Sequence, residues 1–133
     1  LTQGVTISNW SFKEGQTMTI TGFVKSNATY FVVNIISNND DIALHINPRF
    51  SARCDENKVA VNSFKGGVWG LVLQLGNPFT QGKDFKIVIK FTPDGFQGTV
   101  QDNPFTFPNR LEEDKYTLLR VDGGARVRSI EIK

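Results

Sequence analysis

The sequence predicts an all-β protein in which two antiparallel sheets pack face to face as a sandwich. Short segments rich in β-branched and aromatic residues recur along the chain, separated by clusters of Gly, Asn and Asp. No segment has the sustained period of an amphipathic helix, so crossover helices are not expected. The 11 phenylalanines supply large apolar side chains for a core between two sheets. Together these features indicate a β-sandwich of about ten strands.

The first expected strands are apolar runs bounded by turn residues. They are TMTITGFV at 17–24, YFVVNII at 30–36, DIALHIN at 41–47 and KVAVNSF at 58–64. KEGQ comes before the first of them and SNND separates the second from the third. β-Branched and aromatic side chains fit a pleated, half-buried surface, which is why these runs are expected to be strands rather than helices.

The second half of the chain continues the pattern. The expected strands are WGLVLQL at 69–75, FKIVIKF at 85–91, PFTFP at 104–108, YTLLRV at 116–121 and RVRSIEI at 126–132. KGG, TQGK, TPDG and VDGG mark turns between them. In FKIVIKF the phenylalanines and isoleucines share one face and both lysines share the other, which is the alternation of a half-buried antiparallel strand.

Length and charge limit the possible functions. The 133 residues fit a single domain over 1–133, large enough for a real core. A net charge of +2, with scattered basic residues, does not favour nucleic-acid binding. The start LTQGVTISNW lacks the pattern of a secretory signal, no apolar run is long enough for membrane insertion, and one cysteine allows no internal disulfide. The expectation is a soluble protein of a reducing compartment.

The sequence contains no pattern of residues that is typical of an enzyme active site. His45 is the only histidine and no nucleophile-elbow pattern accompanies it, while a zinc site needs more histidine and cysteine ligands. No glycine-rich loop matches a phosphate-binding pattern. The acidic clusters at 40–41 and 112–114 fit solvated turns better than a glycosidase pair. We therefore expect a protein that is not an enzyme and uses no cofactor or metal.

The stretch HINPRF at 45–50 carries the strongest functional signal. In an extended strand, His45, Asn47 and Arg49 point to one face and the apolar residues between them to the other. Asn62 lies in the next expected strand and Trp69 begins the one after it, so all five could share one face. Amide, imidazole and guanidinium groups bind hydroxyls directionally, and indole suits the C–H face of a sugar ring.

Each of these residues also has an ordinary structural explanation. His45 alone fits a satisfied strand residue, Arg49 a solvated charge, and Trp69 a core residue. Pro48 removes a backbone donor, which predicts an edge strand or a bulge. It is the occurrence of polar and aromatic groups on three successive strands that favours recognition of a neutral sugar.

These motifs resemble those of galectins, and fish galectins most closely. The resemblance runs through HINPRF, VNSF with Asn62, GGVWG with Trp69, NPFTQGKDFKI and FTFPNR, and it covers essentially the whole chain. It implies a two-sheet jelly-roll sandwich whose concave sheet binds a β-galactoside. His45, Asn47 and Arg49 would then hydrogen-bond galactose hydroxyls, notably the axial 4-OH. Asn62 would take the 6-OH, and Trp69 would stack beneath the ring.

The resemblance also implies partners and a location. Single-domain galectins bind glycans of glycoproteins or glycolipids, often as homodimers joined through strands near their termini. They are cytoplasmic and reach the outside of the cell without a signal peptide. No membrane insertion is expected.

One part of the motif departs from the family. Galectins usually continue W-G-x-E-x-R after the tryptophan, whereas Val72 and Gln74 stand at these positions here. A hydrogen bond to a charged group contributes about 1.5–3 kcal/mol, so losing such bonds would weaken lactose binding by roughly 2–4 kcal/mol. Arg49 would also lack the usual glutamate partner, and we expect Asp55 or the ligand to supply its acceptor.

Two hypotheses follow from this departure. The first is a lectin with weakened or altered specificity, with Arg53, Asp55 and Gln74 as further site residues, possibly for another hexose such as a mannoside. The second is a galectin-fold structural or interaction protein with little sugar affinity. The role of Cys54 stays open.

Overall fold

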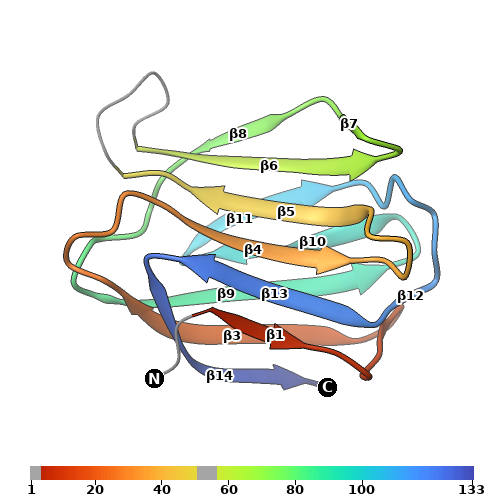
Figure 1. Ribbon diagram of the computed structural model, residues 1–133, viewed down its shortest axis with the longest axis horizontal. Coiled ribbons are helices and arrows are strands. Elements are labelled where there is room, and N and C mark those ends of the chain that lie inside the picture. The colour runs from red at the N-terminus through yellow and green to blue at the C-terminus, as the bar shows by residue number, and fades with distance from the viewer. Residues whose placement is uncertain (1–3, 51–56) are drawn as a thin grey trace.

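Two antiparallel sheets face each other across one apolar core in the computed structural model, which describes residues 4–50 and 57–133. A seven-stranded sheet has the order β1-β13-β4-β5-β6-β7, with β8 also paired to β6, and a five-stranded sheet has the order β11-β10-β9-β3-β14. β12 and β2 form a small separate pair. In Figure 1 the seven-stranded sheet lies in front of the five-stranded one. The predicted two-sheet antiparallel sandwich is therefore confirmed.

The strands of the described residues are short and regular. Their bounds are β1 Val5–Ile7, β2 Phe12–Lys13, β3 Thr17–Val24, β4 Phe31–Ile36, β5 Ile42–Pro48, β6 Lys58–Lys65, β7 Val68–Trp69, β8 Leu73–Gly76, β9 Asp84–Thr92, β10 Gly95–Val100, β11 Asn103–Phe107, β12 Lys115–Tyr116, β13 Leu118–Gly123 and β14 Ala125–Ile132. No helix that could cross a membrane occurs in residues 4–50 and 57–133.

The core lies between the sheets and follows from the alternation of side chains along the strands. Ile20, Ile87 and Ile89 of the five-stranded sheet are fully buried, and so are Ile46 and Val61 of the seven-stranded one. Because successive side chains point to opposite faces, the residues between them lie on the outer faces. Burying apolar area contributes about 25 cal/mol per Å², so this face-to-face packing dominates the stability of the sandwich.

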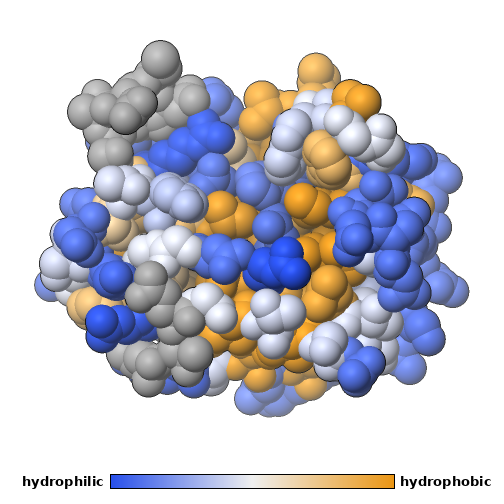
Figure 2. All heavy atoms as spheres, in the orientation of Figure 1, coloured by the Kyte–Doolittle hydropathy of each residue, from blue (hydrophilic) through white to orange (hydrophobic). Residues whose placement is uncertain are grey.

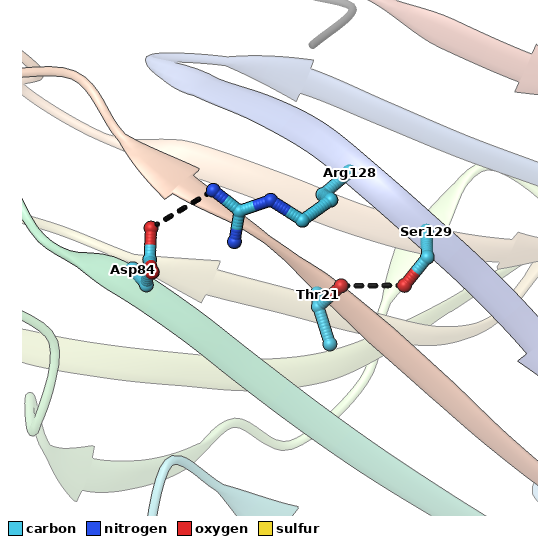
Figure 3. A network of polar contacts seen from close by, with 4 residues as sticks. All are labelled: Thr21, Asp84, Arg128 and Ser129. Carbon is cyan, nitrogen blue, oxygen red and sulfur yellow. Dashed lines mark hydrogen bonds and ion pairs between the residues drawn. The ribbon is translucent and has the colours of Figure 1, made fainter.

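The outer side of the five-stranded sheet is held together by polar contacts between neighbouring strands. Figure 3 shows Arg128 of β14 reaching across β3 to Asp84 of β9, with Nη2 and Oδ1 3.2 Å apart. Thr21 and Ser129 exchange a hydroxyl hydrogen bond beside the register shift between Val127 and Ser129. These contacts are exposed and lie on the sheet opposite the candidate site described below.

The structure corrects the strand prediction for residues 69–75. That segment is two strands, β7 and β8, which pair with different parts of the same strand β6. Residues 70–72 between them leave the sheet, and the N–H of Gly70 donates to the carbonyl of Ser63 at 2.9 Å. The expected strand at 116–121 is likewise divided, since Tyr116 ends β12 and Leu118 begins β13.

Three strands were not predicted, namely β1, β2 and β10. The sequence of β10, GFQGTV, contains two glycines that favour a turn. A Cβ on Gly98 would lie 1.8 Å from the carbonyl oxygen of Val88, so this glycine allows a close approach to the neighbouring strand β9. The prediction for Pro48 was also wrong, because β5 lies between β4 and β6 and its register shift occurs between Ile42 and His45. Pro48 ends the strand instead.

Candidate functional site

A line of polar residues crosses the outer face of the seven-stranded sheet. In register, Arg120 of β13 lies opposite Asn34 of β4, Asn34 opposite His45 of β5, and His45 opposite Asn62 of β6. Directly opposed residues of antiparallel strands share a face, so these four side chains form one row. We call them the polar row. In Figure 2 hydrophilic atoms gather along the middle of this face, over β4 and β5.

His45 is held in a defined tautomer by its neighbour in the row. Its Nδ1 lies 2.7 Å from Oδ1 of Asn34, and because an amide oxygen only accepts, Nδ1 carries the hydrogen. Nε2 is then left as an acceptor. Burial and, as the smaller cause, the charge of Arg49 together lower the pKa of His45 from 6.5 to about 4. The imidazole is therefore neutral at physiological pH.

Asn47 positions the guanidinium of Arg49. Its Nδ2 donates to the carbonyl of Phe31 at 2.9 Å, which fixes the amide and turns Oδ1 toward Arg49. Nε of Arg49 donates to this oxygen at 2.8 Å. Asn47 is buried and Arg49 partly exposed, so the amide acts mainly as a support for the charged group.

Asn62 is fixed by contacts on both ends of its amide. Nδ2 donates to the carbonyl of Gly70 at 3.0 Å, while Oδ1 accepts from the N–H of Ser63 at 2.8 Å and from Nη1 of Arg110 at 3.2 Å. One hydrogen of Nδ2 is left for a ligand. Asn62 therefore offers a donor, and a hydroxyl bound there has to accept.

Arg110 joins the site from the segment after β11. Besides Asn62, it donates to Oγ of Ser63 at 3.1 Å and to the carbonyl of Leu71 at 2.9 Å. Its guanidinium carbon also lies 4.5 Å from the ring centroid of Phe107. A Cβ on Gly70 would come within 2.6 Å of Nη1 of Arg110, so glycine at this position leaves room for the guanidinium.

Trp69 supplies an accessible aromatic surface beside the polar row. Its ring centroid is 4.7 Å from that of His45 and 5.0 Å from that of Phe64. The residue is nevertheless 48% exposed, so it is not part of the core. The indole is therefore fixed by two neighbouring rings and still open to solvent.

These side chains surround an open hollow of about 420 Å³ on the outer face of the seven-stranded sheet. It is lined by His45, Arg49, Ala60, Asn62, Trp69, Val72 and Gln74. An imidazole acceptor, guanidinium and amide donors and an indole surface meet here. This combination can bind a molecule that carries both hydroxyl groups and a ring face of C–H bonds.

The structure brings most of the predicted site residues together. His45, Arg49, Asn62, Trp69 and Gln74 line the hollow, and Asn47 lies behind Arg49. Arg53 and Asp55, which were also predicted, lie outside the described residues, as does Cys54. Among residues 4–50 and 57–133, no group of three or more His, Cys, Asp or Glu side chains could hold a metal ion.

Two residues with a part in the site were not predicted from the sequence. Asn34 sets the tautomer of His45. It lies in β4, which comes directly before β5 in the chain and pairs with it, so the pairing of these two consecutive strands was a usable signal. Arg110 occurs in FTFPNR, a stretch that resembles the galectin pattern, but no spacing links it to Asn62, 48 residues earlier.

Comparison with known proteins gives a consistent result. A family model described as galactoside-binding lectin matches residues 4–132. The chain is 43% identical over 132 residues to a β-galactoside-binding lectin of Electrophorus electricus, with 98% of each chain covered. The solved structure of galectin-1-L2 from Dario rerio has a TM-score of 0.91 and 43% identity, covering 96% of this chain and 98% of the other. CG-16, a homodimeric agglutinin from chicken liver, has a TM-score of 0.90 and 32% identity, covering 98% and 100%.

Proposed function

Since this chain belongs to the galactoside-binding lectin family, the galectins, we propose that its hollow beside the polar row binds a β-galactoside. Members of this family bind sugars without chemically changing them, so the chain is a lectin and not an enzyme. The observation that carries the proposal is the pairing of a neutral His45, with Nε2 as an acceptor, and the guanidinium of Arg49 next to an accessible indole.

Each group has a role that its chemistry supports. A hydroxyl that donates to Nε2 of His45 and accepts from Arg49 is held from two directions, and we assign the axial 4-OH of galactose to this place. Asn62 offers a donor to the 6-OH. Trp69 stacks against the C–H face of the ring. A sugar without the axial hydroxyl leaves buried polar groups unpaired, which is the basis for selectivity.

The affinity is proposed to be weakened or shifted relative to ordinary galectins. Val72 and Gln74 line the hollow where the family pattern has glutamate and arginine. Valine accepts no hydrogen bond, and the amide of Gln74 is neutral. The second sugar of lactose therefore has no charged partners at these two positions, while the side chains assigned to galactose are retained. A different hexose, such as a mannoside, is the alternative that this changed half of the site leaves open.

We also propose that the protein acts as a homodimer on the glycans of glycoproteins or glycolipids. β1 and β14 are edge strands of the two sheets and lie along the same side of the sandwich (Figure 1). Edge strands present unpaired backbone groups that a second copy can cover. The structural neighbour CG-16 is homodimeric, which supports the proposal of a dimer. In keeping with the family resemblance, we propose that the protein occurs in the cytoplasm and, by non-classical secretion, outside the cell.

Calorimetric titration with lactose, galactose and methyl mannoside in parallel tests the proposal. Lactose binding in the millimolar range, with galactose close behind, is the expected result. Tighter binding, with a lactose Kd in the sub-millimolar range, would contradict the proposal that the half of the site for the second sugar is weakened. Binding of methyl mannoside without binding of lactose would show that the site is specific for another hexose. If no sugar binds, the chain is a galectin-fold structural or interaction protein, the second hypothesis drawn from the sequence.

A further inference from the structure

A group of exposed apolar side chains lies beside the proposed sugar hollow. Among the described residues five large apolar side chains are exposed, and four of them belong to the segment 68–72. Leu71 and Val72, which follow Trp69 in this segment, are called the apolar tip. Figure 2 shows hydrophobic atoms at the upper edge of the molecule, over the connection between β7 and β8. Single exposed apolar residues are ordinary, but several in one short segment indicate an interaction site.

We propose that the apolar tip forms a subsite for the aglycone of the bound β-galactoside, the group attached at C1, and that this group is a hydrocarbon chain. The inference rests on the proposed galactoside site and adds to it a ligand class, galactosyl lipids, in which the sugar is attached directly to an apolar chain. The chain would occupy the place that the second sugar of lactose fills with poor complementarity.

The position of the aglycone follows from the order of atoms around the galactose ring. C1 lies across the ring from C4, so with the 4-OH at His45 the bond from C1 leaves on the side of the hollow away from this imidazole. The lining residues that are not assigned to galactose are Ala60, Val72 and Gln74. Ala60 lies opposite Gln74 in the pairing of β6 with β8, and Val72 immediately precedes β8. The first atoms of the aglycone therefore meet a methyl group and a valine beside one neutral amide.

This end of the hollow is chemically suited to a hydrocarbon chain. Of the lining residues in the described part of the chain none is acidic, and neither alanine nor valine has a side-chain hydrogen-bonding group. Val72 is 49% exposed and Leu71 is 82% exposed, so both have apolar area that a chain can cover. Removing this area from water is favourable, whereas a sugar hydroxyl placed against it loses its hydrogen bonds to water.

The backbone of the segment 70–71 is fixed before a ligand binds. The carbonyl of Leu71 accepts a hydrogen bond from Nη2 of Arg110 at 2.9 Å. Gly70 accepts from Nδ2 of Asn62 at 3.0 Å and donates to the carbonyl of Ser63 at 2.9 Å. A segment that is already ordered loses little conformational entropy when a ligand covers it, so the apolar contact contributes more fully to affinity.

The test compares methyl β-galactoside with octyl β-galactoside in calorimetric titrations below the concentration at which octyl glycosides form micelles. The octyl compound should bind about tenfold tighter, which corresponds to about 1.4 kcal/mol or the burial of nearly two methylene groups. Its heat capacity change of binding should also be more negative, which is the mark of buried apolar area. Octyl β-glucoside, which lacks the axial 4-OH, should not bind measurably.

Three variants locate the gain on the protein. Val72→Thr keeps the shape of the side chain but replaces a methyl group by a hydroxyl, so the ratio of octyl to methyl affinity should fall about fourfold. Leu71→Ser should lower the same ratio. Val68→Thr is the matched control, because it makes the same exchange on an exposed valine that precedes Trp69 in β7 and so points to the opposite face. It should keep the ratio.

The outcomes separate the subsite from the sugar site. Equal affinities for the methyl and octyl galactosides overturn the subsite and leave the galactoside site in place, whereas failure of both to bind overturns the two together. Octyl β-glucoside that binds as tightly as octyl β-galactoside would show that the chain binds without the sugar, which overturns the subsite. A ratio that falls equally in Val68→Thr and Val72→Thr, or that stays unchanged in both Val72→Thr and Leu71→Ser, would overturn the assignment to the apolar tip.

Discussion

The amide oxygen of Asn34 lies 2.7 Å from Nδ1 of His45 and so decides which imidazole nitrogen faces the hollow. Neither residue alone fixes this orientation, because imidazole has two possible neutral tautomers.

Asn34→Ala should weaken lactose binding by about 1 kcal/mol, roughly fivefold, because the tautomer with an acceptor at Nε2 loses its stabilising bond. Titration calorimetry measures this effect. Asn38→Ala is a matched control, since Asn38 accepts a hydrogen bond from Thr117 on an exposed turn away from the row. Equal affinity of Asn34→Ala and the wild-type chain would mean that the tautomer is set elsewhere.

Binding and stability should both depend on the titration of His45. Its folded pKa is about 4, whereas the ordinary value is 6.5, so between pH 6.5 and 4 the unfolded chain binds more protons than the folded one. The stability that comes from holding a neutral imidazole is fully present above pH 6.5. The free energy of unfolding therefore decreases as the pH falls from 6.5 toward 4. Sugar affinity should stay constant from pH 8 to about 5 and fall once Nε2 is protonated, near pH 4.

Urea unfolding and lactose titration across this pH range measure the two effects. His45→Gln should remove the part of the pH dependence that arises in the window between 6.5 and 4, since glutamine does not titrate. Lactose affinity that declines already between pH 7 and 6 would show that the imidazole keeps its ordinary pKa in the folded chain.

Arg110 should act on binding through Asn62 without touching the sugar. Arg110→Lys keeps the charge but loses the fork of donors that holds Asn62, Ser63 and Leu71, so lactose affinity should fall by about 1–2 kcal/mol. Gly70→Ala should produce a similar loss, because the added methyl group would displace Nη1 of Arg110.

The two changes meet in one network, so their effects should not add. The double variant Arg110→Lys with Gly70→Ala is expected to bind lactose about as weakly as either single variant. Calorimetry of all four chains gives the coupling energy. Strict additivity would mean that Gly70 and Arg110 influence the sugar by separate routes.

Placing at positions 72 and 74 the glutamate and arginine that the galectin resemblance predicts should strengthen lactose binding. Val72→Glu with Gln74→Arg introduces charged partners at the edge of the hollow, and the gain should reach about 2–4 kcal/mol if both reach the second sugar. Free galactose, which lacks the second sugar, should gain much less, and comparing the two ligands by calorimetry separates the contributions. An unchanged lactose affinity would show that residues 72 and 74 do not face the second sugar.

The alignment of the site residues was predictable because it depends on local rules. The period of two along a strand puts His45, Asn47 and Arg49 on one face, and pairing of neighbouring strands brings Asn62 opposite His45. The exposure of Trp69 was harder to predict, since a tryptophan in an apolar strand usually belongs to the core. It is exposed because β7 ends at this residue and the chain leaves the sheet.

Other features depend on contacts between distant segments, which a sequence pattern does not reveal. The break at residues 70–72 is stabilised by Arg110, whose partner Leu71 comes 39 residues earlier in the chain. The strand β10 was missed because its glycines are typical of turns, yet one of them serves a close approach between strands. In each case tertiary packing overrides the local preference.

Trp69→Ala distinguishes a binding role of the indole from a structural one. The side chain is about half exposed, so its removal should change the free energy of unfolding by less than about 1 kcal/mol, whereas lactose binding should become too weak to measure. Phe31→Ala is the contrasting variant, because Phe31 is fully buried and its truncation should destabilise the fold by about 3–5 kcal/mol. Urea unfolding and calorimetry on both variants provide the comparison. A large destabilisation by Trp69→Ala would favour the structural hypothesis, in which the aromatic cluster of His45, Phe64 and Trp69 supports the sheet edge and binds no sugar.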